Sequence, residues 1–366
     1  MSTVAAIFAI VLLALVVIDV FETIVLPRRV AGRFRLTALF YRATWNPWAA
    51  IGRRVANKKK REAYLSIYGP LSLLVLLAFW TGVVIVSFAL LRWSAAADVT
   101  AQGAKVSSAA ETYISAISFV GIEEALPRDA WARALTVLEA LSGFALLAMV
   151  IGYLPVLYQS FSRRESNITL LDARAGSPPS ASELLRRFGH GDGAQGLPEL
   201  LRDWEHWAAE LLESHVSYPV LGFFRSQHDN QSWLGSMTTI LDVCAVILAG
   251  IEDISPFQAE LTFAMARHAI VDLAKVFNVP PKVRCHDRLP PDDLTRFRAL
   301  LAQSGVKLRE GAEAEKRLAE LRRMYDPYVE ALSQRLLMDL PNWIGDNRHN
   351  WTTSKWERIA GSVVLH

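Results

Sequence analysis

The chain has 366 residues, a formal net charge of +3 and a hydrophobic share of 52%. This small net charge gives no reason to expect nucleic acid as a partner. The chain has two cysteines, Cys244 and Cys285, which provide no disulfide framework and indicate reduced thiols in a cytosol. Because the apolar residues are concentrated in about the first 160 positions, we predict a membrane-embedded part followed by a part with the composition of a soluble protein.

The first predicted element is an apolar run from Thr3 to Leu26, about 24 residues and therefore long enough to span a bilayer as a helix. It lacks the basic start and the small-residue cleavage site of a secretory signal, so we expect it to be retained. Asp19 and Glu22 lie one turn apart near its end. We interpret them as interfacial partners of Arg28 and Arg29, with a role in gating as the alternative.

The loop that follows, residues 28–61, is strongly basic and completes a first unit of residues 1–63. A short basic loop beside two spans stays cytoplasmic. The loop also carries phenylalanine, tyrosine and tryptophan residues, a combination typical of a segment that lies on an anionic lipid surface. We therefore predict membrane lipids as partners of this loop, and a merely solvated loop is the alternative.

Residues 64–164 are predicted to form a second unit, a pore domain with two spanning helices. The outer helix is expected over residues 64–91. The inner helix is expected over residues 130–161, which is longer than a bilayer requires, so its end should project into the cytosol. Residues 94–107 carry few charges and are placed outside. The N-terminus is therefore predicted outside and the C-terminus in the cytoplasm.

The segment from residue 108 to residue 127 lies between these two helices. Ser108 and Glu111 have capping-box spacing, so a helix should start there. The apolar-rich run to Phe119 covers about 18 Å at the usual helical rise, which is too short to cross a membrane. Irregular backbone at membrane depth is tolerated only where protein buries it or where it lines a water-filled cavity. We therefore predict a re-entrant pore helix and loop.

Residues 165–183 are predicted to be a linker, because Ser177-Pro-Pro-Ser cannot continue a helix, and residues 184–366 to be a helical cytosolic domain. The apolar run 233–250 has Asp242 at its centre, so we interpret it as a core helix of this domain rather than a fourth span. The helical rhythm predicts further helices over residues 200–212 with Pro198 in the first turn, 257–277, 291–305 and 312–338, and near the C-terminus.

The residues after the predicted pore helix read Phe119-Val120-Gly121-Ile122-Glu123-Glu124 and are followed by Pro127. The stretch from Glu111 to Arg164 resembles the pore domain of the tetrameric potassium-channel family, in which a pore helix, a filter and an inner helix follow one another, here with an extra N-terminal span. The family's filter reads Thr-Val-Gly-Tyr-Gly-Asp, with a proline a few residues later. Further along, Gly152-Tyr-Leu-Pro155 and Ser162-Arg-Arg-Glu165 resemble a bacterial branch of such proteins with a helical cytosolic extension.

The resemblance implies a homotetramer around one pore in a bacterial inner membrane. In the filter, Glu123 stands for the family's second glycine, Ile122 for its aromatic residue and Phe119 for its threonine. A potassium filter is a ladder of backbone carbonyls, whereas rings of carboxylates favour cations in general. A weakly selective cation pore, a potassium-selective pore and a pore fold that no longer conducts all stay open. The predicted filter and pore residues are Ser118, Phe119, Val120, Gly121, Ile122, Glu123 and Glu124.

Four positions on the inner helix are candidates for gating: Glu139, Gly143, Gly152 and Pro155. Glu139 is a carboxylate inside a span, so it is either functional or held by structural hydrogen bonds, and its spacing from Arg133 excludes pairing on one helix face. Gly143 matches a position where the family often carries a hinge glycine, with close helix packing as the alternative. Gly152 and Pro155 predict a kink.

The sequence has no catalytic Ser-His-Asp spacing and no dinucleotide fingerprint, so we expect no enzyme, no catalytic residue and no metal or cofactor beyond K⁺ or Na⁺ in the pore. It predicts an all-α, multi-pass membrane protein with three transmembrane helices plus a re-entrant pore helix, followed by a helical cytosolic domain. The predicted function is a cation channel regulated by that domain. The alternative is a non-conducting membrane scaffold or sensor.

Overall fold

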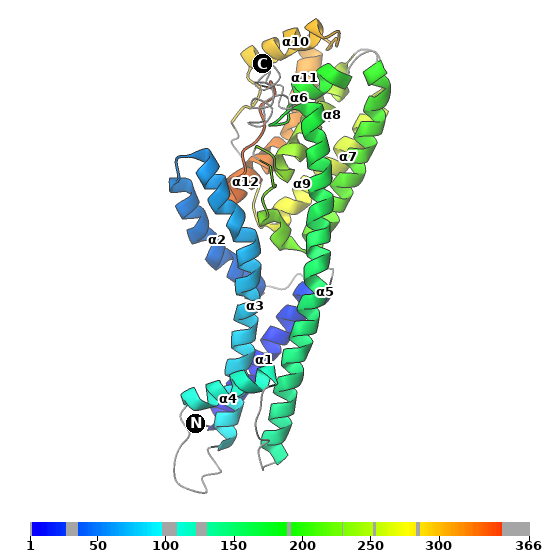
Figure 1. Ribbon diagram of the computed structural model, residues 1–366. Coiled ribbons are helices and arrows are strands. Elements are labelled where there is room, and N and C mark those ends of the chain that lie inside the picture. Colours follow the sequence, from blue (N-terminus) through cyan, green and yellow to red (C-terminus); the bar gives the residue numbers. More distant parts are fainter. Residues whose placement is uncertain are drawn as a thin grey trace, which may run out of the picture. The chain divides into compact units, whose positions relative to one another are not determined.

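The computed structural model describes residues 2–26, 36–96, 108–121, 130–188, 192–228, 230–251, 254–282 and 286–345. The regular elements in these residues are all helices, and four of the helices are long and apolar enough to cross a membrane (Figure 1). The chain divides into two compact units. Unit 1 comprises residues 1–54 and 67–159, and unit 2 comprises residues 55–66 and 160–366.

Unit 1 is built from long helices that pack side by side and from one short helix between them (Figure 1). The elements of this part of the chain are α1 (Ser2–Val20), a π-helical turn (Phe21–Val25), α2 (Leu36–Arg54), α3 (Lys58–Ala96), α4 (Ser108–Val120) and α5 (Ala130–Ala175). Most of α3 and the first part of α5 belong to unit 1, and the remaining turns of both helices belong to unit 2. The segments predicted as the first span, the outer helix, the pore helix and the inner helix thus correspond to α1, α3, α4 and α5.

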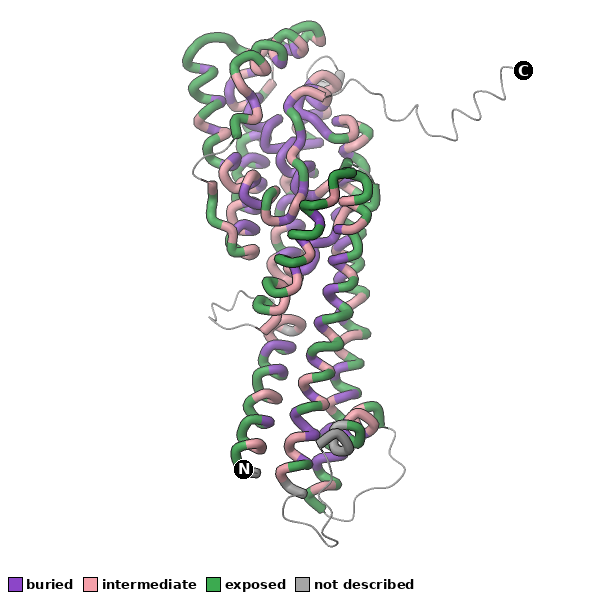
Figure 2. Tube along the Cα trace, turned by 90° about the vertical axis from the view of Figure 1, so that its left-hand side faces the viewer, coloured by how far each residue is buried: buried purple, intermediate pink, exposed green. Residues whose placement is uncertain are grey.

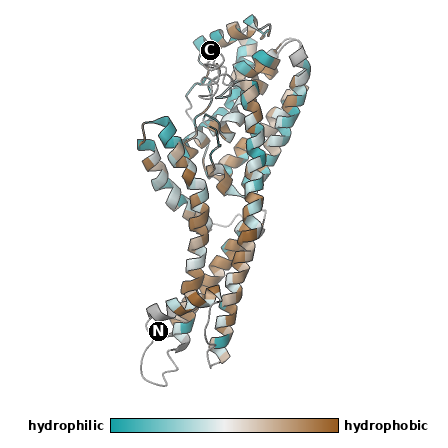
Figure 3. Ribbon diagram, viewed as in Figure 1, coloured by the Kyte–Doolittle hydropathy of each residue, from teal (hydrophilic) through white to brown (hydrophobic). Residues whose placement is uncertain are grey.

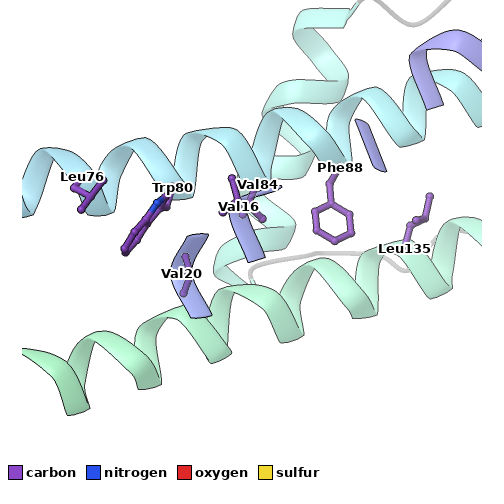
Figure 4. Close-up of a cluster of buried hydrophobic side chains, with 7 residues drawn as sticks. All are labelled: Val16, Val20, Leu76, Trp80, Val84, Phe88 and Leu135. Atoms are coloured by element: carbon purple, nitrogen blue, oxygen red, sulfur yellow. The ribbon is translucent and has the colours of Figure 1, made fainter. Parts of the chain in front are cut away.

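The interior of unit 1 is an apolar cluster between three helices (Figure 4). Its members come from α1, α3 and α5, and they are Val16, Val20, Leu76, Trp80, Val84, Phe88 and Leu135. Beyond this cluster the same helices carry large exposed apolar side chains, as the hydropathy and burial colouring show (Figures 2 and 3). Only 22% of the most apolar window of α1, 39% of that of α3 and 22% of that of α5 is buried. Apolar surface on this scale suits contact with lipid rather than with water.

A buried carboxylate joins the first three helices of unit 1. Asp19 on α1 accepts hydrogen bonds from the backbone N–H of Thr37 at 3.1 Å, from the Thr37 hydroxyl at 2.6 Å and from Trp80 Nε1 at 2.9 Å. These donors satisfy a group that would be costly to leave unpaired at this depth. The predicted partners Arg28 and Arg29 lie outside the described residues.

Unit 2 contains the remaining helices, arranged around one buried helix. They are α6 (Ala181–Phe188), α7 (Asp192–Ser217), a 3₁₀ turn (Pro219–Phe223), α8 (Trp233–Gly250), α9 (Phe257–Val276), α10 (Pro291–Gln303), α11 (Ala312–Arg323) and α12 (Asp326–Leu336). The central helix is α8, of which 89% is buried against its neighbours. Its first turn is capped by the Ser232 hydroxyl, which accepts from the Gly235 N–H at 2.9 Å.

Several predicted boundaries differ from the structure. The outer helix, expected over residues 64–91, spans Lys58–Ala96. The inner helix does not end at Phe161 but continues to Ala175, so the first residues of the predicted linker are helical. Helix α7 begins at Asp192 and contains Pro198 in its interior rather than in its first turn. The predicted helix 312–338 is two helices, because Pro327 at the start of α12 has no N–H to continue the hydrogen bonding of α11. The helix expected near the C-terminus falls outside the described residues.

Candidate functional site

The candidate site is the C-terminal end of α4, the short helix predicted to be the pore helix. Helix α4 begins at Ser108, as the capping-box spacing predicts, and it lies across α3 and α5 rather than along them (Figure 1). It stops at Gly121, whose φ of +78° is a conformation that glycine adopts without steric cost. The Gly121 N–H donates to the Ser118 carbonyl at 2.9 Å, which closes the last turn.

A buried arginine holds this end of α4 to both neighbouring helices. Arg92 on α3 donates through Nη2 to the Ser118 hydroxyl at 2.8 Å, to the Thr136 hydroxyl at 2.9 Å and to Glu139 Oε2 at 3.0 Å. The side chain of Arg92 is 8% exposed and that of Glu139 is fully buried. Because a buried charge is tolerated only when it is paired and hydrogen-bonded, the four residues form one interdependent cluster.

A second contact brings the backbones of α4 and α5 together. A Cβ atom placed on Gly143 of α5 would lie 2.0 Å from the carbonyl oxygen of Phe119 and 3.1 Å from its carbonyl carbon. No side chain fits into that space. In this structure Gly143 therefore serves close helix packing, which was one of its two predicted roles.

These two contacts place the end of α4 well inside the length of its neighbours. At a rise of about 1.5 Å per residue, Glu139 lies about 13 Å and Gly143 about 20 Å along α5 from Ala130. In the chain, α4 follows α3 and precedes α5.

The structure describes only part of the predicted filter. Ser118 is buried in the arginine cluster, the Phe119 carbonyl lies against Gly143, and Val120 is 61% exposed. Ile122, Glu123 and Glu124 lie outside the described residues, so the predicted acidic ring stays a prediction. Pro127 falls in the same segment.

The other gating candidates on α5 have no comparable contacts. A Cβ atom on Gly152 would meet nothing within 4 Å, so packing does not require glycine there. Pro155 lies inside α5, which is helical on both sides of it. Of the four predicted gating positions, the structure brings Glu139 and Gly143 to the end of α4, whereas Gly152 and Pro155 are farther along the helix.

Sequence reasoning missed two members of the cluster, Arg92 and Thr136. Arg92 directly follows the predicted outer helix, and its side chain is buried. A signal for the pairing was present, because a carboxylate within a span needs a cationic partner and the spacing of Arg133 excludes that residue. Arg92 is the first residue after the neighbouring predicted span of residues 64–91. Thr136 has no such signal, since a threonine on an apolar helix is common.

A second buried arginine fixes the part of α5 that belongs to unit 2. Arg164 donates to the carbonyls of Leu221 at 2.9 Å and Phe224 at 3.0 Å, and it pairs with Glu165 at 2.9 Å. Burial, together with the nearby positive charge of Arg164, lowers the pKa of His215 to about 3. His215 is therefore neutral, and its Nε2 lies 3.4 Å from Arg164 Nη1 without adding a second charge. This last part of α5 is held firmly within unit 2.

No family model, curated protein or solved structure matches the chain.

Proposed function

We propose that this chain is a pore-loop membrane protein that passes cations and is regulated by its helical second part, as the potassium-channel resemblance implies. The observation that carries the proposal is the cluster of Arg92, Ser118, Thr136 and Glu139. It fixes the last turn of α4 between two helices whose surfaces suit lipid. A helix too short to cross is thus held at a fixed position between two long apolar helices, which supports its assignment as a pore helix.

The polarity of α4 supports cations as the permeating species. A helix C-terminus carries partial negative charge, because its last carbonyls have no intrahelical donors. Glu123 and Glu124 follow this end within a few residues. In a proposed homotetramer, four helix ends and up to eight carboxylates would surround one axis, an arrangement that attracts cations and repels anions.

The proposal places the protein in a bacterial inner membrane, with the basic residues of the 28–61 segment on anionic lipids. Two of those residues have other partners: within unit 2, Lys58 and Arg61 pair with Asp339 at 3.0 and 3.2 Å. Lipid contact therefore falls to exposed members of α2 such as Arg53 and Arg54.

Ion flux into liposomes tests the proposal. We expect the purified chain to admit K⁺ and Na⁺ and to exclude chloride, and the double substitution Glu123→Gln with Glu124→Gln to reduce cation flux at least tenfold. The matched control is Glu310→Gln with Glu313→Gln, which neutralises two exposed carboxylates of unit 2 and should leave flux unchanged. A correctly folded tetramer without flux would instead favour the non-conducting scaffold or sensor.

A further inference from the structure

Unit 2 contains a strongly cationic cavity of about 380 Å³. It opens between α11, the start of α12 and the residues that precede α10. The cationic lining residues are Lys282, Lys316, Arg322 and Arg323, joined by His286, whereas the acidic ones are Asp287 and Asp326.

Two of the cations project from one face of α11 towards the opening. Lys316 and Arg323 are seven positions apart, which places them on the same side of the helix two turns from each other. Ala319 lies between them and keeps the space between the two charges open. Both cations are exposed, and among the described residues neither has a carboxylate within 4.0 Å.

The carboxylates of the cavity are already engaged by arginines. Arg322 donates to Asp287 at 2.7 Å and lies 3.2 Å from Asp326, and its guanidinium also packs over the ring of Trp343. Asp326 is shared with Arg288, at 3.7 Å. Because both carboxylates are compensated from within the fold, the charges of Lys316 and Arg323 are left over at the rim.

We infer that this cavity binds a small phosphate ligand carrying at least two negative charges, held chiefly by Lys316 and Arg323, because the Lys282 ammonium is already paired with Glu330 at 3.4 Å. The volume lies in the range of small-ligand sites, and arginine and lysine are the side chains that recognise phosphate oxygens. Most lining residues are charged, which favours a compact anion over a ligand with an aromatic ring. The inference does not depend on ion conduction, since it concerns binding to unit 2.

Calorimetric titration of the detergent-solubilised full chain with inorganic pyrophosphate tests this inference. In 150 mM NaCl we expect saturable binding, which would be weakened at least tenfold by Lys316→Glu with Arg323→Glu. The matched control reverses two exposed cations that do not line the cavity, Lys307→Glu with Arg317→Glu, and it should keep the affinity of the unmodified chain. Sodium benzoate, a monovalent anion with an aromatic ring, should give no saturable heat.

Three results would overturn the inference. They are the absence of saturable pyrophosphate binding, an equal loss of affinity in the cavity variant and the control, and unchanged affinity in the cavity variant. A parallel arm uses phosphatidylcholine vesicles with and without 5% phosphatidylinositol 4-phosphate. Binding that requires this lipid, with none to pyrophosphate, would show that the cations face a membrane headgroup rather than a soluble phosphate. Circular dichroism of each variant verifies that the helices are retained.

Discussion

Arg92 and Glu139 are the two residues on which the candidate site depends. Their buried side chains come from different helices, 47 positions apart in the chain, and Arg92 donates to both Glu139 and the Ser118 hydroxyl. A buried ion pair contributes little net stability compared with an apolar pair, but removing only one partner leaves an unpaired charge, which costs about 3–5 kcal/mol. The main effect of the pair is therefore on the position of the C-terminal end of α4 against α3 and α5, rather than on net stability.

A double-mutant cycle measures this dependence. We expect Arg92→Met and Glu139→Met each to lower the free energy of unfolding by about 3 kcal/mol or more, and the double variant to be more stable than either single variant. The reason is that only the single variants bury an isolated charge. Reversible denaturation in mixed micelles gives the four values. If the two losses simply add, the residues act independently and the cluster does not work as a unit.

At the scale of elements, the approach of α4 to α5 is set by one glycine. The Phe119 carbonyl occupies the space that a Cβ atom on Gly143 would need, whereas the space beside Gly152 on the same helix is open. The structure therefore leaves no room for a side chain at Gly143 but does leave room at Gly152, although both glycines were predicted candidates for gating.

Substitution by alanine separates the two positions. Gly143→Ala should force α4 away from α5, with a loss of about 1–3 kcal/mol typical of overpacking and a fall in cation flux. Gly152→Ala is the matched control, and it should be neutral or stabilise α5 by up to about 1 kcal/mol, because alanine favours the helix. Thermal unfolding and liposome flux are measured on both variants. Equal behaviour of the two would mean that the contact at Phe119 does not position α4.

The helices themselves follow closely from local sequence signals, and the contacts between them do not. Capping-box spacing gives the start of α4, and apolar run length gives α1, α3 and α5. The end of α5 was placed too early because the continuous apolar run stops near Phe161, whereas the helix continues to Ala175 with Ile168 and Leu171 buried within unit 2. The Arg92–Glu139 pair was missed because it joins segments far apart in sequence, where no periodicity relates them. The sequence singles out Gly143, but the choice between a hinge and close helix packing depends on its contact with the Phe119 carbonyl, which the sequence does not show.

At the scale of the whole molecule, the burial of the four apolar helices separates them into two kinds. Helices α1, α3 and α5 leave most of their apolar windows uncovered, whereas α8 is 89% buried against other helices of unit 2. A helix already surrounded by protein gains nothing from lipid, and one whose apolar faces are uncovered requires it. This difference favours α8 as a core helix of unit 2 over a fourth span, a choice that labelling can test.

Cysteine labelling of intact cells tests that topology, in a background of Cys244→Ala with Cys285→Ala. The basic start of α3 should be cytoplasmic, so Lys60→Cys should react with a membrane-impermeant maleimide only after permeabilisation. Trp131→Cys, at the start of α5, should react in intact cells. Lys307→Cys follows α8 and distinguishes the two span counts: with three spans it behaves like Lys60→Cys, and with a fourth crossing at α8 it becomes accessible from outside. Labelling of Lys60→Cys in intact cells would invert the topology and place the end of α4 on the cytoplasmic side.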